Sequence, residues 1–393
     1  MSKFDDIRPY HDDEVKAAIK SLLEDREFLD FLGKYHSPRL SRFAPPLVRL
    51  VAGYVLRRSL GKVSSIKEFQ EVISYYAKRI VTETMTDFVF EGVDQLDSER
   101  AHLFIGNHRD IAGDSMLVDY ALWLSGRDTV RIAVGDNLIQ RKFATHLMKL
   151  NKSFFIRRSE EGAKKVYAAL LQSSQYIHDS IAKGSSVWIA QAEGRAKNGL
   201  DITDPAIIKM FALADRKAPL GKLVKQLSIV PVSISYEYDP CDLLKAKELS
   251  AISESGQYLK PAGEDLLSLV KGLGEFKGQV YLRFGAAIQG EFESPEEIAN
   301  ALDRQLLDNY QLYHVNYWAL QQLAGRPDGD SGGYIDTWRA LGSTVRLTDT
   351  AAFEARLAAC PEEHQQKWLE MYANPVVNKY RSKSSRLAPA QLA

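Results

Sequence analysis

From residue 87 onward the sequence alternates short apolar runs with amphipathic stretches, and this alternation constrains the fold more than any other feature. The apolar runs are rich in Val, Ile and aromatic residues, which is typical of buried strands. Strands that alternate with helices form a sheet covered by helices, so the sequence predicts an α/β fold with a mixed, largely parallel sheet. The predicted strands are 87–93, 102–107, 130–135, 152–158, 185–191, 227–238 and 279–288, and the predicted helices between them are 114–124, 137–150, 160–183 and 204–216.

Helices are predicted on both sides of this alternating region. Apolar spacing near 3.6 predicts helices over 11–35 and 64–84. A Ser-Pro-Glu-Glu sequence at 294–297 predicts the start of a long helix that ends at about residue 320. Gly, Pro and Asp predict a loop at 325–333, followed by two or three further helices and a disordered tail from residue 382. We therefore divide the chain into a helical N-terminal region (1–85), a central domain (86–320) and a helical C-terminal extension (321–393).

The overall charge and the cysteine content exclude several classes of protein. The chain has 51 basic and 51 acidic side chains, whereas a protein that binds nucleic acid generally carries a basic excess. Two cysteines, Cys241 and Cys360, are too few for a disulfide scaffold and fit a reducing compartment. No apolar run approaches the roughly 18 residues that cross a bilayer, and the acidic N-terminus does not have the form of a signal peptide. These features predict a cytoplasmic protein that does not bind nucleic acid.

The charge is unevenly distributed along the N-terminal region. Residues 1–30 hold nine acidic and five basic side chains, whereas residues 37–62 hold six basic side chains and no acidic one. Large apolar residues separate those six, and Pro45 and Pro46 favour a helix that starts there and ends near Leu60. Such a helix can lie in a membrane interface with its cations on the headgroups, or it can pack on the core and expose a solvated basic face.

The first polar constellation follows the predicted strand 102–107. It contains Asn107, His108, Asp110 and Asp114. Because ligands of open α/β sheets bind at the carboxyl ends of the strands, we expect a site here. An imidazole beside a carboxylate can act as a general base whose ring the carboxylate orients. The simpler alternative is that Asp114 only caps the helix that follows it.

Two more predicted strands end in cationic side chains. The strand 152–158 ends in Arg157 and Arg158, which can fork onto a phosphate or remain surface charges. The strand 185–191 runs into a loop that combines cations with glycines, a composition typical of anion-binding loops and also of plain polar loops. Its candidate residues are Glu193, Gly194, Arg195 and Lys197.

A proline interrupts the predicted strand 227–238. Pro231 predicts that this strand lies at an edge of the sheet or contains an irregularity, because proline cannot donate a ladder hydrogen bond. The apolar residues on either side of it are candidates for the lining of an acyl groove.

Together and in this order, these motifs resemble those of the glycerolipid acyltransferase superfamily, which includes glycerol-3-phosphate and lysophosphatidate acyltransferases. The resemblance covers roughly residues 85–290 and implies a glycerol-3-phosphate acyltransferase-like fold. It rests on His108 to Asp114, which approximates a His-x4-Asp motif, on Phe154-Phe-Ile-Arg-Arg158, on Glu193-Gly194 with Arg195 and Lys197, and on Val230-Pro-Val232.

The chain departs from that family pattern at two places. Five residues, not four, separate His108 from Asp114, so either Gly113 permits an extra looped residue or Asp110 takes the role of the carboxylate. We favour Asp114, because it leads the predicted helix as the family aspartate does. Ala192 also replaces the usual proline before the Glu-Gly pair, and Arg195 stands where many members have Gly or Thr. Both differences bear on the identity of the acceptor substrate more than on the class of reaction.

The resemblance implies transfer of a fatty acyl group from acyl-CoA or acyl carrier protein to a hydroxyl of a glycerol-phosphate-type acceptor. His108 would be the general base, and Asp114, or alternatively Asp110, its carboxylate. The resemblance implies no metal and no bound cofactor, and a lipid partner that segment 37–62 would reach at the cytoplasmic face of a membrane. The implied substrate-binding residues are Arg157, Arg158, Glu193, Gly194, Arg195 and Lys197, and the acyl-groove candidates are Phe155 and Pro231.

Three other functions stay open at the level of the sequence. The same chemistry can serve a different lyso-lipid or an amino-acid-derived lipid. The fold can also belong to a non-catalytic protein that binds acyl chains or lipids. A metal-dependent phosphoesterase is suggested by Gly106-Asn107-His108, although the chain lacks the Asp-x-His and Gly-His-x-His motifs that this class requires.

Overall fold

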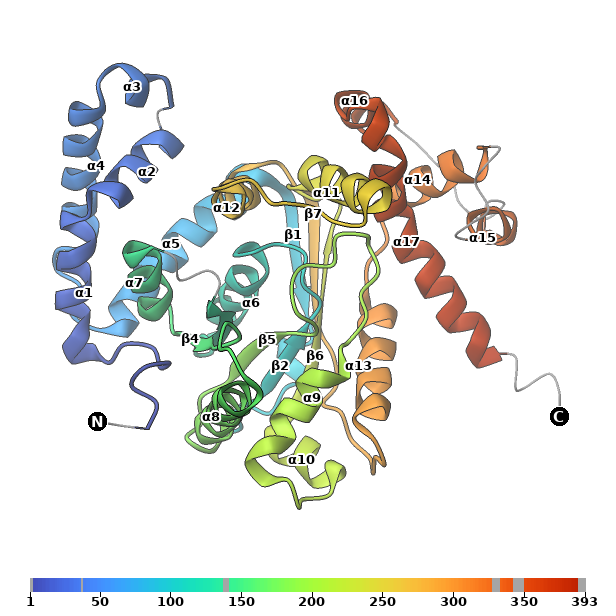
Figure 1. Ribbon diagram of the computed structural model, residues 1–393, viewed down its shortest axis with the longest axis horizontal. Helices are drawn as coiled ribbons and strands as arrows, with labels where there is room; N and C mark the ends of the chain where they lie inside the picture. Colours follow the sequence, from blue (N-terminus) through green and yellow to red (C-terminus); the bar gives the residue numbers. More distant parts are fainter. Residues whose placement is uncertain (1–2, 37, 137–140, 327–332, 342–349, 388–393) are drawn as a thin grey trace.

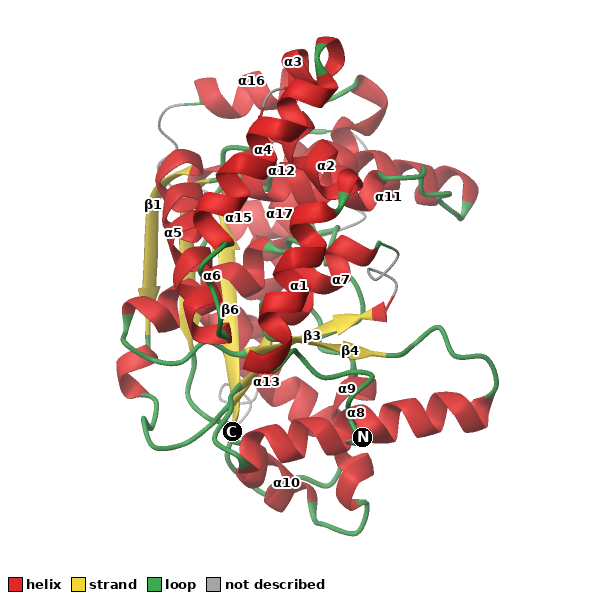
Figure 2. Ribbon diagram, turned by 90° about the vertical axis from the view of Figure 1, so that its left-hand side faces the viewer, coloured by secondary structure: helices red, strands yellow, loops and turns green. Residues whose placement is uncertain are grey.

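The computed structural model describes residues 3–36, 38–136, 141–326, 333–341 and 350–387. Its centre is a seven-stranded sheet with the order β1-β7-β6-β2-β5-β3-β4, in which every pairing is parallel except β6 with β7. This confirms the predicted fold class, and each strand falls on a predicted one. The strands are β1 (Met85–Glu91), β2 (Leu103–Gly106), β3 (Arg131–Gly135), β4 (Ser153–Ile156), β5 (Val187–Ala190), β6 (Ile229–Tyr236) and β7 (Gly278–Phe284). Figure 2 shows β3 and β4 turned steeply relative to β1 and β6, which is the accumulated twist of a large sheet.

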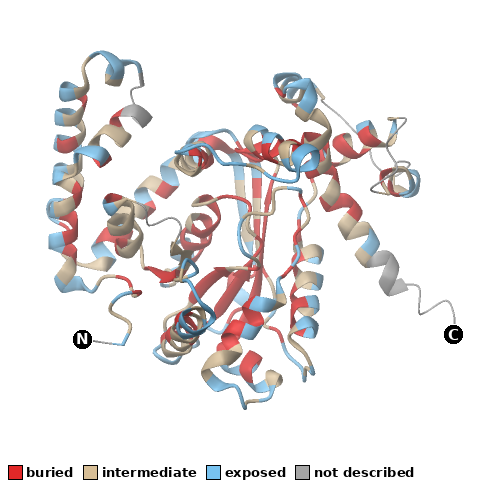
Figure 3. Cartoon of the chain, in the orientation of Figure 1, coloured by how far each residue is buried: buried red, intermediate tan, exposed pale blue. Residues whose placement is uncertain are grey.

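Helices cover both faces of the sheet. Successive strand residues point to opposite faces, so Leu103 and Ile105 pack in one core cluster and Phe104 in the other. Figures 1 and 3 show the two helical layers and the buried residues concentrated between them. One face is covered by α5 (Ile66–Thr84) and α6 (Gly113–Leu124), and the other by α8 (Ala163–Ala182), α9 (Pro205–Phe211), α10 (Leu220–Leu227) and α13 (Pro295–Asn309). Short 3₁₀ helices occupy Val93–Gln95 and Ala212–Asp215.

The N-terminal helices form a separate cluster beside the sheet, at the left of Figure 1. The single helix predicted over 11–35 is wrong, because the chain breaks at Asp25. Its carboxylate accepts a hydrogen bond from the Phe28 N–H at 3.0 Å and so caps a second helix. The predicted helix start at Pro45 and end at Leu60 are confirmed. The helices here are α1 (Asp12–Glu24), α2 (Arg26–His36), α3 (Pro38–Phe43), α4 (Pro45–Leu60) and α7 (Lys142–Leu150).

The C-terminal helices form another cluster on the far side of the sheet. The long helix predicted from 294 to about 320 is wrong, because α13 ends at Asn309 and the next helix begins at His314. Tyr313 separates the two: its N–H donates to the Asn316 side chain at 2.8 Å, and its hydroxyl donates to the Ser235 carbonyl at 3.3 Å. Tertiary contacts therefore override a sequence that contains no helix breaker. The helices of this cluster are α11 (Asp242–Ser255), α14 (His314–Ala324), α15 (Tyr334–Leu341), α16 (Ala351–Ala359) and α17 (Glu362–Leu387), whereas α12 (Glu264–Gly274) contacts α5.

Some predictions fall partly or wholly outside the described residues. The predicted disordered tail begins inside α17, and residues 388–393 lie outside the described ranges, as do 327–332 of the predicted loop and 137–140 of a predicted helix. None of the described helices has the length and apolar character needed to cross a membrane.

Pro231 lies in the interior of the sheet, so its predicted edge position is wrong. Its strand, β6, runs between β7 and β2. The Pro231 carbonyl accepts a hydrogen bond from the Gly285 N–H at 2.8 Å, just beyond Val232 and Phe284, which form the last pair of the β6–β7 ladder. The N–H and C=O of a strand residue point to the same side, so the missing donor faces the end of β7. The sheet tolerates proline there because only one terminal ladder bond is lost.

Candidate active site

The candidate site lies in the loop between β2 and α6, at the carboxyl end of the central strand. The strand ends at Gly106, where a Cβ atom would approach the Trp188 indole nitrogen to 2.9 Å, so this position requires glycine. Neighbouring β5 brings its own loop alongside, and the Ala196 N–H donates to the His108 carbonyl at 2.8 Å. The two loops predicted separately from the sequence thus meet at one edge of the sheet.

His108 and Asp114 form a hydrogen-bonded pair. The imidazole Nδ1 lies 2.8 Å from Asp114 Oδ2, and the His108 side chain is 17% exposed while Asp114 is buried. An ionised carboxylate can only accept, so Nδ1 carries the proton and Nε2 presents a lone pair. In the part of the chain that the structure describes, no other group forms a hydrogen bond with that ring. The sequence left Asp110 and Asp114 as alternatives, and the structure pairs Asp114 with the ring.

Asp114 accepts three further hydrogen bonds. Its Oδ2 accepts from the main-chain N–H groups of Arg109 at 2.6 Å and Asp110 at 2.9 Å, and its Oδ1 accepts from the Tyr236 hydroxyl at 2.8 Å. Burial favours the neutral acid, but these donors and His108 outweigh it and hold the pKa of Asp114 below its ordinary value. The extra residue of the loop is accommodated because both peptides turn their N–H groups toward this carboxylate.

Asp110 has a different role in the same loop. Its Oδ1 accepts from the N–H groups of Ala112 at 3.1 Å and Gly113 at 2.6 Å, which caps the first turn of α6. Its Oδ2 is buried and has no hydrogen-bond partner among the described residues. Burial, together with repulsion from Asp114, raises the pKa of Asp110. This carboxylate therefore supports the helix and does not contact the imidazole.

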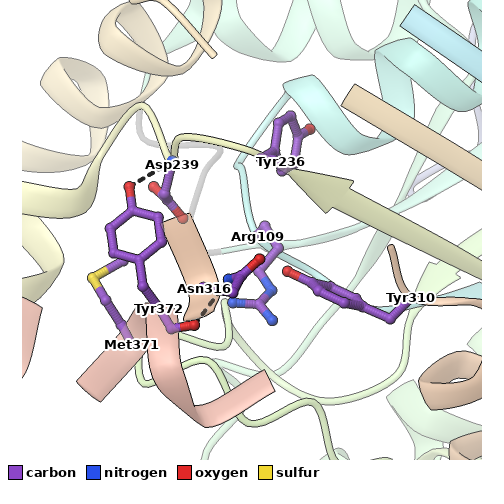
Figure 4. A pocket seen from close by; sticks show the side chains of 7 residues that line it. All are labelled: Arg109, Tyr236, Asp239, Tyr310, Asn316, Met371 and Tyr372. Atoms are coloured by element: carbon purple, nitrogen blue, oxygen red, sulfur yellow. Dashed lines mark hydrogen bonds between the residues drawn. The ribbon is translucent and has the colours of Figure 1, made fainter. Parts of the chain in front are cut away.

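A layer of buried polar groups lies behind the pair. Asn107 bonds both main-chain groups of Ile234 on β6, at 2.9 and 2.8 Å, and Arg109 forms an ion pair with Asp201 at 2.5 Å. Burial disfavours the Arg109 cation, but the Asp201 charge outweighs this and raises its pKa. Figure 4 shows Arg109 beside the ring of Tyr310 in a small pocket that the C-terminal helices complete. The pocket is lined by Arg109, Tyr236, Asp239, Tyr310, Asn316, Met371 and Tyr372.

The predicted anion-binding residues divide into two groups in the structure. Arg158 and Glu193 meet, with Nη1 and Oε1 3.3 Å apart, although they follow different strands. Arg157 instead forms an ion pair with Asp6 at 2.5 Å and donates to the Gln172 side chain at 2.7 Å. The structure therefore places one arginine of the predicted pair over the β5 loop and the other on the N-terminal segment.

The rest of the β5 loop is also placed. Gly194 has a φ of +78°, a conformation that side chains other than glycine rarely adopt. The Nη1 atom of Arg195 is buried and has no partner within the described ranges, and Lys197 forms an ion pair with Glu248 on α11. Arg195 is thus the cation of this loop that is least committed to other protein groups.

The acyl-groove candidates lie inside the sheet. Phe155 is buried in β4, with the Lys149 ammonium 5.7 Å from its ring, and the Pro231 ring approaches Gly285, where a Cβ atom would lie 2.9 Å from it. Their part in acyl binding stays a prediction.

Sequence reasoning missed several residues that support the pair. Tyr236 had a detectable signal: it ends β6, a predicted strand, and the carboxyl ends of parallel strands meet at one edge of the sheet. Asp201 and Lys245 had no such sequence signal, because each contacts the loop between β2 and α6 from a segment in which we identified no motif. Within the described ranges, no three His, Cys, Asp or Glu side chains are grouped to hold a metal ion.

Comparisons with known proteins find similarity to acyltransferases. A family model named Acyltransferase matches residues 87–235. A curated relative, dihydroxyacetone phosphate acyltransferase of Oryctolagus cuniculus, is 25% identical over 228 residues, which cover 57% of this chain and 32% of the relative. The chain therefore spans about a third of that relative's length. A solved structure, the 1-acyl-sn-glycerophosphate (LPA) acyltransferase PlsC from Thermotoga maritima, is 15% identical and covers 77% of this chain and 99% of its own, with a TM-score of 0.39, which is too low to define the fold.

Proposed function

The chain belongs, through its central residues, to the glycerolipid acyltransferase superfamily, and from this premise we propose that it transfers a fatty acyl group from an acyl thioester to a hydroxyl of a phosphate-bearing acceptor. The observation that carries the proposal is the 2.8 Å bond between His108 and buried Asp114 at the carboxyl end of β2. It leaves Nε2 as the basic atom of a partly exposed imidazole. The relative named for acylation of dihydroxyacetone phosphate supports a phosphate-bearing acceptor.

In the proposed reaction, Nε2 of His108 removes the proton of the acceptor hydroxyl as its oxygen attacks the acyl carbonyl. The tetrahedral intermediate then expels the thiolate of coenzyme A or acyl carrier protein, and the imidazolium returns the proton to that thiolate. Asp114 stabilises the imidazolium and keeps the ring oriented. General-base catalysis of this kind supplies roughly 10²–10⁴-fold, and positioning of the substrates supplies much of the rest.

The anion of the acceptor is proposed to lie over the β5 loop. Arg195 offers a buried Nη1 that has no partner among the residues the structure describes, and Arg158 is held across this loop by Glu193. Both cations can turn to a phosphate, which arginine binds through two parallel N–H groups. We assign Arg157 and Lys197 a secondary part, because their carboxylate partners, Asp6 and Glu248, lie closer to them than the 3.3 Å that separates Arg158 from Glu193.

Substitution of His108 tests the reaction. We expect His108→Ala to lose at least about 10²-fold in kcat with acyl-CoA or acyl carrier protein thioesters, because the variant lacks the proposed general base. The assay offers glycerol-3-phosphate, dihydroxyacetone phosphate, lysophosphatidate and an amino-acid-derived lyso-lipid, with products identified by mass spectrometry. His314→Ala, at an exposed position on α14, is the matched control. Turnover of the His108 variant at the wild-type rate would exclude the mechanism, and thioester binding without any product would favour the lipid-binding alternative.

We further propose that α3 and α4 bring the enzyme to the cytoplasmic face of a membrane. Their apolar side chains are exposed, among them Phe43 at 84% and Leu50 at 70%. The sequence segment 37–62, which contains both helices, carries six basic residues. Burying such apolar side chains in an interface stabilises binding by about 1.5–3 kcal/mol each. The exposed apolar residues of the two helices are Leu40, Phe43, Leu47, Leu50, Val51, Tyr54 and Val55.

Vesicle binding tests this surface. We expect Phe43→Ser with Leu50→Ser to lower partitioning onto phosphatidylglycerol-containing vesicles by at least about tenfold. Tyr75→Ser is the control, because Tyr75 is exposed on α5, outside the proposed surface. Equal partitioning of all three proteins would assign the apolar face of α3 and α4 to another role.

A further inference from the structure

A fully buried lysine contacts the active-site loop from outside the predicted site. Lys245, on α11, is 1% exposed, and its ammonium donates to the main-chain oxygen of Arg109 at 2.7 Å. The same ammonium forms an ion pair with Asp239. Lysine is almost never fully buried unless it is paired, so this position costs desolvation that a surface residue would avoid. The lysine lies 136 residues from Arg109 in the sequence.

The peptide bond between Arg109 and Asp110 connects this lysine to the catalytic pair. A trans peptide is planar, and its C=O and N–H point in opposite directions. Here the C=O accepts from Lys245, and the N–H donates to Asp114 Oδ2 at 2.9 Å. A cation on the carbonyl oxygen polarises the amide and strengthens its N–H as a donor. Lys245 therefore acts on the carboxylate through one rigid unit.

The preceding peptide is arranged in the same way. The His108 carbonyl accepts from the Ala196 N–H at 2.8 Å, while the Arg109 N–H donates to Asp114 Oδ2 at 2.6 Å. Two consecutive peptides thus hold the same carboxylate oxygen, and each is fixed at its far side. The first is fixed by a main-chain group, and the second by the Lys245 side chain, which a substitution can remove.

The C-terminal extension in turn fixes the partner of Lys245. The Asp239 N–H donates to the Tyr372 hydroxyl at 2.9 Å, and that hydroxyl donates to Asp242 at 3.0 Å. Figure 4 shows Asp239 and Tyr372 lying close to Arg109 and Tyr236. The charged and titratable groups that interact with Asp114 or Asp110 include His108, Arg109, Arg195, Tyr236, Asp239, Cys241, Lys277 and Tyr310.

We propose that Lys245 is a positioning residue, which holds the Asp114 carboxylate on the His108 ring through the Arg109–Asp110 peptide. The expected effect on kcat rests on the proposed acyl transfer. The expected effect on the hydrogen exchange of the loop does not. Without the ammonium, the peptide loses its fixed orientation, and Asp114 loses a strengthened donor. The C-terminal extension then supports this arrangement through the hydrogen bond between Tyr372 and Asp239.

Replacement of the ammonium by an apolar group of similar length tests the proposal. We expect Lys245→Met to lower kcat by about tenfold or more, with the KM of thioester and acceptor unchanged within about twofold, because a misplaced base slows the chemical step. Hydrogen exchange of the peptide that contains residues 107–114, measured by mass spectrometry, is expected to become faster. The control is Lys152→Met, because Lys152 is also largely removed from solvent but donates to the Thr129 hydroxyl at 2.6 Å and carbonyl at 3.3 Å, away from the loop.

The two measurements, kcat and hydrogen exchange of the loop, distinguish failure of the positioning role from failure of the proposed reaction. Unchanged kcat and unchanged loop exchange in Lys245→Met would overturn the positioning role. Equal losses in both lysine variants would show a general effect of burial, which also overturns it. If even the wild type transfers no acyl group, the exchange experiment still decides whether Lys245 holds the loop. Should Lys245→Met fail to fold because Asp239 is left unpaired, Asp239→Asn with Lys245→Met removes both charges and is measured instead.

Discussion

Two buried aspartates on α6 show opposite electrostatics. Asp114, in the first turn, accepts four hydrogen bonds, and these hold its pKa below the ordinary range despite complete burial. Asp119, further along the same helix, accepts one bond from the Val130 N–H at 2.8 Å, and burial raises its pKa to about 7. Burial alone therefore does not decide whether a carboxylate is charged. At Asp114 the hydrogen bond and charge of His108, together with the other donors, outweigh burial, and at Asp119 a single donor does not.

The largest expected effect comes from removing the charge of Asp114. We expect Asp114→Asn to lower kcat by about 10²–10⁴-fold, because an amide cannot stabilise the imidazolium and its NH₂ group opposes the two main-chain donors. Initial rates at saturating thioester measure this. Asp119→Asn is the comparison, and it should retain the wild-type kcat. Similar rates for the two variants would remove the distinction between these carboxylates.

The next effect concerns stability and its dependence on pH. The pKa of Asp119 is higher in the folded chain than the usual value of about 3.9, so its neutral form favours folding, and stability is lost as pH rises from about 4 through 7. Between pH 5 and pH 8 the wild type should lose about 3 kcal/mol relative to Asp119→Asn, which does not titrate. Urea unfolding at both pH values measures the difference.

A constant offset between these two proteins is expected, because the asparagine keeps the acceptor for Val130 but adds an unpartnered NH₂ group. The change in that offset with pH is the test. An offset that stays the same from pH 5 to pH 8 would mean that Asp119 is charged throughout, like Asp114.

The sequence predicted the strands well and the donors around the carboxylates poorly, for a physical reason. Each strand is a local run of β-branched and aromatic residues, and all seven runs became strands. The pairing of His108 with a nearby aspartate could be predicted because Asp110 and Asp114 both follow the same strand end, and the preference for Asp114 came from the family resemblance. The state of a buried carboxylate depends instead on groups far along the chain, such as Tyr236 and Lys245. The helix boundary at Tyr313 was missed for the same reason, because its hydroxyl bonds a strand 78 residues away.

A smaller effect is expected from removing one donor of Asp114. Tyr236→Phe deletes the hydroxyl that donates to Oδ1 at 2.8 Å, and a hydrogen bond to a charged group contributes about 1.5–3 kcal/mol. Because three donors remain, we expect kcat to fall only about threefold to tenfold. Tyr313→Phe, which removes a buried hydroxyl from a neutral carbonyl at 3.3 Å, is the control. A loss as large as that of Asp114→Asn would mean that Tyr236 has a direct part in the reaction.

The smallest effect is expected at Asp110, the carboxylate that the sequence left as an alternative partner of His108. Asp110→Asn retains the oxygen that accepts from Ala112 and Gly113, and Asp110 does not contact the His108 ring, so the loss of its charge changes little. We expect kcat to stay within about twofold, whereas Asp110→Ala removes the cap of α6 and lowers stability by about 1 kcal/mol. Rates and urea midpoints of the two variants measure these effects. If Asp110→Asn lost as much activity as Asp114→Asn, the loop would change its carboxylate during turnover, and the contrast along α6 would not identify the catalytic one.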